Sequence, residues 1–296
     1  MATGIGGPGQ TYLVYRPDVW TPFIDRVFKT RLSAAKFFKD FSDSVTMGGK
    51  SIMIPSDAQY TSSAVTTTSG DITANLVTDT RTILDINTWQ HVARIFADFQ
   101  AAQVGQQYRL KEVYAENMAH ALAKKFETDL FGLATAANIS RVVNASTAGI
   151  KSSDLESAIG IIESYNVPRE ECMFFLKPKA YFSEVLAVQK LYDASQFGRP
   201  SIIEGSHDQI YGIPISLSNN LLAPNASIEG GAGRNLLIHS RAWAYAFGNL
   251  PGGMPSGVRL TEKGSENLRV TVVADIMYGV KKVADSYRAV RLISKN

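Results

Sequence analysis

Hydrophobic residues recur every three or four positions across residues 103–134, with lysine and glutamate largely between them. This spacing predicts an amphipathic helix whose charged face includes Glu127. No proline interrupts the stretch, and Gly132 followed by weak helix formers near Asn138 gives it an end. At 1.5 Å per residue the helix would run roughly 45 Å, so we expect the rest of the chain to be arranged along it as a spine. Its apolar positions are Leu110, Val113, Tyr114, Met118, Ala121, Leu122, Phe126, Leu130 and Phe131.

Two strand-like runs precede this helix, Val45 to Pro55 and Thr82 to Ile95, and a long stretch rich in threonine, serine and aspartate separates them. A loop of that length without a core of its own is uncommon in a compact domain. Its β-prone threonines favour an extended ribbon. Because an isolated hairpin is marginally stable in water, we expect the ribbon to project from its own subunit and lie against something else.

The segment from Val19 to Phe41 is amphipathic and contains five of the fourteen phenylalanines. Two interpretations carry equal weight here. The segment is either a helix packed on its own core or an arm laid across a partner, because both would bury the same apolar face.

After the spine, helical and strand-like patterns alternate between residues 148 and 264, which predicts a compact α/β domain. Three further strand-like runs follow, and we expect them to return to the spine, so that the chain leaves its first layer, builds an inserted domain and comes back. The middle elements are a helix near 152–166, strand Cys172–Leu176, helix Lys179–Val188, strands Ile210–Leu221 and Asn235–His239, and a short helix or turn at Arg241–Phe247. The closing runs are Leu268–Ala274, Gly279–Val283 and Tyr287–Ile293.

Composition limits the classes of function. With 45% apolar and 19% charged residues and no apolar run long enough to span a membrane, the chain is of the ordinary globular type. The lone Cys172 excludes an internal disulfide and a multi-cysteine metal site. A net charge of +3 is too small to predict a nucleic-acid-binding surface.

Catalytic signatures are incomplete. Gly49-Lys50-Ser51 ends like a phosphate-binding loop, but Ser44 stands where that motif needs glycine, and a strand rather than a helix follows. The glycines at 4–9 have no preceding strand, so they do not predict a dinucleotide site. Ser206-His207-Asp208 holds the letters of a hydrolase triad, yet consecutive residues rarely converge as a triad requires.

The remaining polar residues also lack the spacing of an active site. The run Arg169-Glu170-Glu171 is typical of a solvated turn. No histidine belongs to a metal-binding motif. We therefore predict no enzyme, no cofactor and no metal. The histidines are His91, His120, His207 and His239.

Three phrases, taken in order, resemble the major capsid proteins of tailed bacteriophages, whose shell fold is named after phage HK97. EVYAENMAHALAKKFETDLFG is similar to the spine helix of that family, with Asp129 as its terminal acidic residue. DQIYGIPISLSNNL is similar to a strand of its axial domain, and VVADIMYGVKKVADSYRAVRL to its closing peripheral strands.

The resemblance implies an α+β, HK97-like capsid fold that covers nearly the whole chain. An N-terminal arm would take residues 1–45 and an extended β-hairpin, the E-loop, residues 46–95. A peripheral domain with the spine helix would take 96–147 and 265–296, and an inserted axial α/β domain 148–264.

The resemblance also implies a structural role. Copies would assemble as hexamers and pentamers of an icosahedral shell that encloses double-stranded DNA without sequence-specific binding. The subunit would assemble in the host cytoplasm and reside in the virion. A separate scaffolding protein, a portal and a decoration protein are the further partners, and no membrane is involved. The alternatives are a shell protein of an encapsulin-like nanocompartment and, in a different class, a soluble enzyme.

Charge placement suggests how subunits meet. Residues 51–80 contain aspartates but no lysine or arginine, whereas the preceding segment is basic. We expect the acidic hairpin to face a basic strip on a neighbour. Some family members join subunits through a lysine on the E-loop, but Lys50 is the only lysine near this hairpin, so we expect no covalent crosslink. The expected contact residues are Asp57, Asp71 and Asp79 on the hairpin, and Lys29, Arg31, Lys281 and Lys282 on the neighbour.

Overall fold

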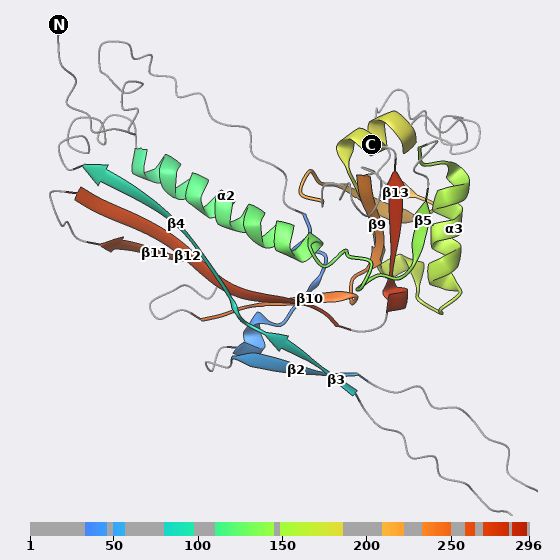
Figure 1. Cartoon of the computed structure of the whole chain (residues 1–296), viewed down its shortest axis with the longest axis horizontal. Helices are drawn as coiled ribbons and strands as arrows, with labels where there is room; N and C mark the ends of the chain where they lie inside the picture. The colour runs from blue at the N-terminus through green and yellow to red at the C-terminus, as the bar shows by residue number, and fades with distance from the viewer. Residues whose placement is uncertain are drawn as a thin grey trace, which may run out of the picture.

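The computed structural model describes residues 33–45, 50–56, 80–97, 110–144, 149–185, 209–221, 233–249, 258–263, 269–283 and 286–294 of the 296-residue chain. Within these residues two larger sheets lie side by side, and a two-stranded ribbon projects from one of them (Figure 1). A long helix lies along the first sheet and a shorter helix against the second (Figure 1). The architecture is therefore α+β.

Helix α2 (Leu110–Phe131) is the predicted spine. Its 22 residues correspond to about 33 Å at 1.5 Å per residue. Met118, Leu122, Phe126 and Leu130 recur every fourth position and are buried on one stripe, as the apolar spacing predicts. They pack against strand β12 (Arg269–Lys282), so the helix is held by the sheet beneath it.

The first sheet is built around β12, whose alternate residues face opposite ways. Val272 and Tyr278 lie on the side of α2, in the same apolar cluster as the buried stripe of the helix. Met277 packs on the other side, in the cluster beneath the ribbon. Strands β10, β11 and β4 pair with β12 in antiparallel fashion, and β1 pairs with β10 in parallel. The partners are β1 (Lys39–Asp40), β10 (Trp243–Phe247), β11 (Val258–Lys263) and β4 (Thr88–Ala97).

The second sheet is buried on both faces. On one face Phe174 and Leu237 pack against helix α3 (Ser152–Glu163). On the other, Phe175 and Leu236 join the cluster that contains the end of α2. Strands enclosed on two sides need continuous apolar sequence, as in CMFFL. The order is β5 (Val142–Asn144), β13 (Ala289–Ser294), β9 (Gly233–His239), β6 (Cys172–Leu176), β8 (Ile213–Leu217) and β7 (Gln209–Ile210).

The short elements complete the description. Gly212, with a φ of 79°, lies in the turn between β7 and β8, where glycine adopts the left-handed conformation without strain. Helix α4 continues as a π-helical turn, which replaces the part of the predicted helix Lys179–Val188 that lies within the described residues. These elements are α4 (Pro178–Ala180), η5 (Tyr181–Val185), η3 (Ser42–Val45), η4 (Arg169–Glu171) and η6 (Ser286–Arg288).

Three interpretations from the sequence need correction. The run Thr82 to Ile95 is two strands, β3 (Thr80–Asp85) and β4. The predicted helix or turn at Arg241–Phe247 is strand β10, because its aromatic residues face α2 while the alanines between them face the ribbon. The run Tyr287–Ile293 leaves the spine and forms β13, paired with β9 in the second sheet.

These pairings place β10 and β11 in the sheet of the spine and β13 in the other sheet, whereas the expected domain division assigned them the opposite way. The physical reason is pairing. β10 and β11 lie along β12, and the apolar residues of β13 are buried on both faces between β5 and β9. The division into four parts stays a prediction.

We expect Phe126→Ala to destabilise the subunit by about 3–5 kcal/mol, because truncating a buried phenylalanine removes apolar contacts and leaves a cavity. The Phe126 ring lies 5.0 Å from Phe247 and 5.1 Å from Tyr278, centroid to centroid. Urea unfolding of the unassembled subunit measures the loss. The control is Phe182→Ala, whose side chain is 57% exposed and which should stay within about 0.5 kcal/mol. Equal losses for both variants would contradict the packing described here.

Candidate functional site

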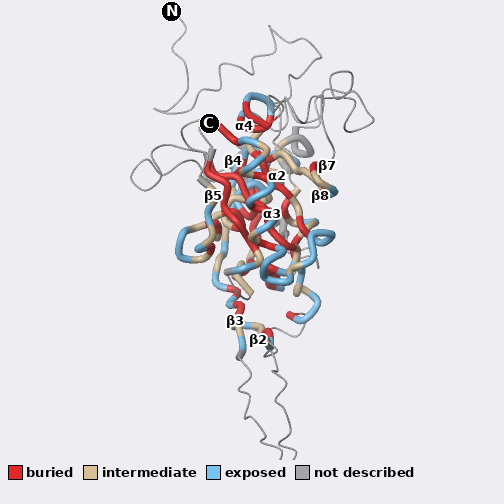
Figure 2. Tube along the Cα trace, turned by 90° about the vertical axis from the view of Figure 1, so that its right-hand side faces the viewer, coloured by how far each residue is buried: buried red, intermediate tan, exposed pale blue. Residues whose placement is uncertain are grey.

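The ribbon consists of β2 (Ser51–Ser56) and β3. Among the described strands these two pair only with each other, and they extend away from both sheets (Figures 1 and 2). One of its faces is apolar and buried at the base, with Ile54 and Leu84. The opposite face carries Met53 and Ile83, directly paired across the strands and 58% and 38% exposed. Exposed apolar residues on a two-stranded ribbon are typical of a surface that a partner covers.

The base of the ribbon is fixed to the first sheet. Leu84 and Ile86 pack with Ala244 of β10, and the Thr82 hydroxyl donates to the Val283 carbonyl at 2.9 Å. A Cβ on Gly279 of β12 would overlap the Asp85 carbonyl oxygen, so glycine is needed where the ribbon backbone crosses the sheet. The direction of the ribbon is therefore set by its own subunit.

Strand β4 carries two further exposed apolar side chains. Trp89 is 63% exposed and Ile95 51% exposed, and α2 lies against the opposite side of this sheet. The Trp89 indole Nε1 donates to Asp275 Oδ2 at 3.0 Å, which holds the ring over β12. We name Met53, Ile83, Trp89 and Ile95 the apolar strip. It lies along the side of the ribbon and sheet that α2 leaves uncovered.

A buried carboxylate holds the N-terminal segment. Glu127 of α2 is 2% exposed, and its Oε1 accepts the backbone N–H groups of Ser33 and Ala34 at 2.8 and 2.9 Å. Its Oε2 accepts the side-chain amide of Asn220, just beyond β8. One side chain thus joins the spine, the incoming segment and the second sheet. The sequence-based placement of Glu127 on the charged, solvent-facing side of the helix was wrong.

The described part of the N-terminal segment packs on its own subunit. Phe38 lies 5.0 Å from Trp243, centroid to centroid, and the Tyr245 hydroxyl donates to the Ala35 carbonyl at 2.9 Å. Burial, with a smaller contribution from Asp40, raises the pKa of Tyr245 to about 12, so the hydroxyl keeps its proton. For residues 33–41 the expected packing on the subunit's own core is confirmed, but these residues form a turn and strand β1 instead of the expected helix. Residues 1–32 lie outside the described residues.

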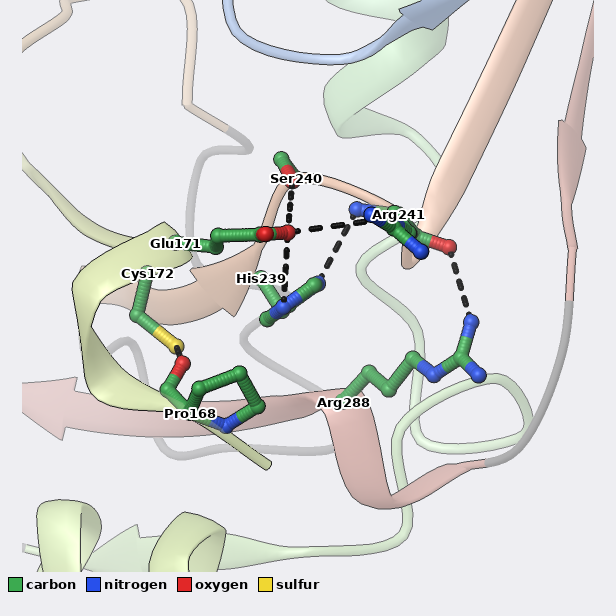
Figure 3. Close-up of polar contacts among 7 residues, drawn as sticks. All are labelled: Pro168, Glu171, Cys172, His239, Ser240, Arg241 and Arg288. Carbon is green, nitrogen blue, oxygen red and sulfur yellow. Dashed lines mark hydrogen bonds and ion pairs between the residues drawn. The ribbon is translucent and has the colours of Figure 1, made fainter. Parts of the chain in front are cut away.

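A second polar group gathers where β9 ends (Figure 3). His239 Nε2 lies 3.3 Å from Glu171 Oε2, and the Arg241 backbone N–H donates to His239 Nδ1 at 3.1 Å. The Ser240 hydroxyl lies 3.4 Å from the same Glu171 oxygen. The letters resemble a triad, but both imidazole nitrogens are engaged, and serine contacts the carboxylate instead of the histidine. This geometry joins segments and does not activate a nucleophile.

The neighbouring thiol is equally inert. Cys172 is buried and lies 3.4 Å from the Pro168 carbonyl oxygen (Figure 3). Burial is the main cause, with nearby glutamates, of a pKa raised to about 12. Because the thiolate is the reactive form, Cys172 is a structural residue.

Most of the expected contact residues lie outside the described residues, namely Asp57, Asp71, Asp79, Lys29 and Arg31. The structure places the two that remain at the end of β12. Lys281 is exposed. Lys282 is half-buried, and its Nζ donates to the Asn138 carbonyl at 3.1 Å, so it stabilises its own subunit.

Other motifs can be placed as well. Lys50 is exposed and Ser51 begins β2, so no helix follows the Gly-Lys-Ser motif. The Arg169-Glu170-Glu171 run is an exposed 3-10 turn, as predicted, although Glu171 also binds the His239 group. In the described parts of the chain, no three metal-binding side chains come together and no helix has the length and apolarity needed to cross a membrane.

Two polar groups that the fold assembles, those of Glu127 and His239, were not predicted from the sequence. Glu127 had a weak signal, since it lies one residue from the buried stripe and four residues from Ala123. The His239 group had none, because Glu171 reaches His239 only through the pairing of β6 with β9, although Arg241 is two residues from His239 in the sequence.

No protein-family profile matches the sequence, and neither does any curated protein. Solved structures do match. A structure from Mycobacterium phage Che8 is similar, with a TM-score of 0.73 and 18% identity over 94% of this chain and 97% of that chain. The capsid structure of cyanophage P-SCSP1u gives a TM-score of 0.73 and 18% identity over 94% and 92%.

A third similar structure is the holo-SrpI encapsulin complex from Synechococcus elongatus, with a TM-score of 0.54 and 12% identity over 88% of this chain and 85% of that chain. Similarity at this level of identity shows the fold. The predicted α+β, HK97-like capsid fold is confirmed over nearly the full length.

We expect Glu127→Ala to destabilise the subunit by at least about 2 kcal/mol, because each buried donor left without an acceptor costs about 1–3 kcal/mol. The N-terminal segment should also be released, and trypsin should cleave faster after Lys36 and Lys39. Glu127→Gln keeps one acceptor but turns an amide toward Asn220. Its loss of stability and its cleavage rate should therefore lie between those of the wild type and of Glu127→Ala. Lys124→Ala, exposed on the same helix, is the control. An unchanged cleavage rate in Glu127→Ala would contradict the clamp.

Proposed function

We propose, starting from the HK97-like fold that this chain shares with phage capsid proteins, that it is the major capsid subunit of a tailed phage. Copies assemble as hexamers and pentamers of an icosahedral shell that encloses a double-stranded DNA genome. The observation that carries the proposal is the similarity to the cyanophage capsid structure over 94% of this chain. The activity is assembly, and no chemical step is required.

The surfaces of the subunit support this role. The ribbon is the base of the proposed E-loop, and its Met53–Ile83 pair is open to solvent in the single subunit. A closed shell would cover such surfaces by repeating the same contacts between copies. In this proposal the apolar strip supplies buried area, and the chain divides into arm 1–45, E-loop 46–95, peripheral part 96–147 with 265–296, and axial part 148–264. Strands β10 and β11 cross to the peripheral sheet and β13 to the axial sheet.

The partners follow from the same proposal. A separate scaffolding protein and a portal would act during assembly in the host cytoplasm, and a decoration protein could bind the finished virion. The enclosed DNA would be held without sequence readout, in keeping with the net charge of +3.

A nanocompartment shell is the second candidate, because the encapsulin complex shares the fold over 88% of this chain. Its lower TM-score, 0.54 against 0.73, favours the phage capsid. An enzyme is the least favoured class, since the similar structures named above include a capsid and an encapsulin complex.

Electron microscopy of the purified protein tests the proposal. We expect closed icosahedral particles, and in phage-infected cells particles that carry nuclease-protected DNA and one portal vertex. Particles with a protein cargo and no portal would favour the nanocompartment. A monodisperse small oligomer at every concentration and salt tested would overturn the shell assignment.

We further propose that Asp57, Asp71 and Asp79 face a basic strip on the neighbour that includes Lys29, Arg31, Lys281 and Lys282. Exposed ion pairs are worth about 0–1 kcal/mol each, so they set the register of subunits more than they hold them. Lys281 fits this role better than Lys282, because Lys282 already donates to Asn138.

Asp71→Lys is therefore expected to lower the yield of closed particles several-fold at low salt, since it places like charges together. Light scattering and sedimentation measure the yield. Lys281→Glu in the same chain should restore part of it if these two residues are close. The matched control is Glu170→Lys, a charge reversal on exposed η4. A yield that responds neither to salt nor to Asp71→Lys would discard the charged contact while leaving the shell proposal intact.

A further inference from the structure

The chain crosses between the two sheets at a polar junction. Residues 240–242 lead from β9 to β10, and between β12 and β13 the structure describes Val283 and η6 (Ser286–Arg288). The two crossings are tied together, because the Val283 N–H donates to the Ala242 carbonyl at 3.0 Å and Arg288 Nη1 donates to the Arg241 carbonyl at 3.4 Å (Figure 3). The conformation of this short turn therefore affects how one sheet sits against the other.

His239 holds the first crossing through both of its ring nitrogens. Nδ1 accepts the backbone N–H of Arg241 at 3.1 Å, so in this arrangement Nδ1 carries no proton. Nε2 then carries the proton and faces Glu171 Oε2 at 3.3 Å. Glu171 also accepts the Ser240 backbone N–H on its own carbonyl at 3.0 Å. The turn therefore requires a neutral imidazole, whose Nδ1 can accept the Arg241 N–H.

We propose that His239 is a proton-sensitive lock on this junction, which holds the turn when neutral and releases it when protonated. On acidification Nδ1 takes a proton from solvent, and its lone pair is no longer available. Two donors, Nδ1–H and the Arg241 N–H, then face each other, and their hydrogen bond is lost. The Nε2 contact with Glu171 remains and becomes an ion pair. The turn must move while the imidazole stays, so residues 240–242 change conformation.

The surroundings set the pH at which this occurs. Burial lowers the pKa of His239 below its usual 6.5, and Arg288 and Arg241 lower it further, while Glu171 opposes them. His239 is paired across the strands with Cys172, which stays neutral because of its raised pKa. The charged groups around it on η4, the turn and η6 are Arg169, Glu170, Glu171, Arg241 and Arg288, and Glu163 of α3 pairs with Arg169 at 3.6 Å.

The lowered pKa of His239 determines how stability changes with pH. The unfolded chain binds the proton at a higher pH than the folded one, so the unfolded state holds more protons between the two pKa values. The stability that His239 contributes is therefore complete above pH 6.5. It is lost as pH falls from 6.5 through the lower folded-state pKa.

The test uses the full chain with spin labels on one helix of each sheet. Asn117→Cys on α2 and Ser153→Cys on α3 are exposed positions, and Cys172 stays unlabelled because it is buried and protonated. Labelled subunits are diluted with unlabelled ones, so that only distances within a subunit are measured. Pulsed electron resonance gives the distance distribution from pH 7.5 to 5.0, and histidine-selective NMR gives the titration of His239.

We expect the distance distribution to shift or broaden with a midpoint that coincides with the His239 titration. His239→Asn is the matched variant, since its Oδ1 can accept the Arg241 N–H and does not titrate. Its distribution should be the same at every pH. Glu171→Gln, which removes the opposing charge, should move the midpoint to lower pH.

Three results would overturn the lock. They are a distribution that stays constant while His239 titrates, the same shift in His239→Asn, and a His239 that remains neutral down to pH 5.0. The inference concerns the fold of one subunit and does not depend on the proposed function, so its failure would leave the shell proposal standing.

Discussion

The fold depends on burying both faces of β12 at once. On one side α2 supplies the apolar stripe around Phe126, and on the other the base of the ribbon supplies Leu84 and Ile86. A strand covered on one face only would leave apolar side chains in water, at roughly 25 cal/mol for each Å² of apolar surface. The spine helix and the base of the ribbon are therefore both needed to cover β12, one on each face of the strand.

This constraint explains why one face of the described ribbon is buried and the opposite face is exposed. Its inner face is needed by β12, but its outer face, with Met53 and Ile83, stays exposed. Burial of the inner face fixes the direction in which the outer face points. A subunit built in this way presents an apolar surface at a fixed angle, which is what a repeating assembly needs if every copy is to make the same contact.

The sequence predicts the elements of this fold better than their partners. Local periodicity identifies α2, α3, β6 and β9, because each has a buried stripe or a continuous apolar run that its own residues specify. It also identifies β13 as a strand, but the choice of sheet depends on Val290 and Leu292 finding β9, a contact between residues more than fifty positions apart. Strand β10 was misread because its alternation of aromatic residues with alanine is short, and small residues weaken a pattern based on size.

The functional residues also differ in how well the sequence predicts them. The exposed Met53 and Ile83 could be expected from a threonine-rich ribbon too long for a turn, since such a ribbon needs outside support. Glu127 had only a weak signal, because a glutamate close to two lysines on a helix is normally solvated, and only the approach of Ser33, Ala34 and Asn220 gives it a reason to be buried. His239 is a similar case, since its partner Glu171 lies almost seventy residues earlier in the chain and reaches it only through the fold.

Apolar contacts and hydrogen bonds have different tasks where the two sheets meet. One apolar cluster spans both sheets, with Phe131, Phe175 and Trp243, and it keeps them together without specifying an angle, because the hydrophobic effect has no direction. Hydrogen bonds are directional, so the few at residues 239–242 and 283–288 select one angle. Replacing those hydrogen bonds with others would change the angle between the two sheets and would expose little of the buried apolar area. A shell of hexamers and pentamers, as proposed, requires one sequence to occupy more than one setting, and this junction is where the chain can adjust while each sheet stays intact.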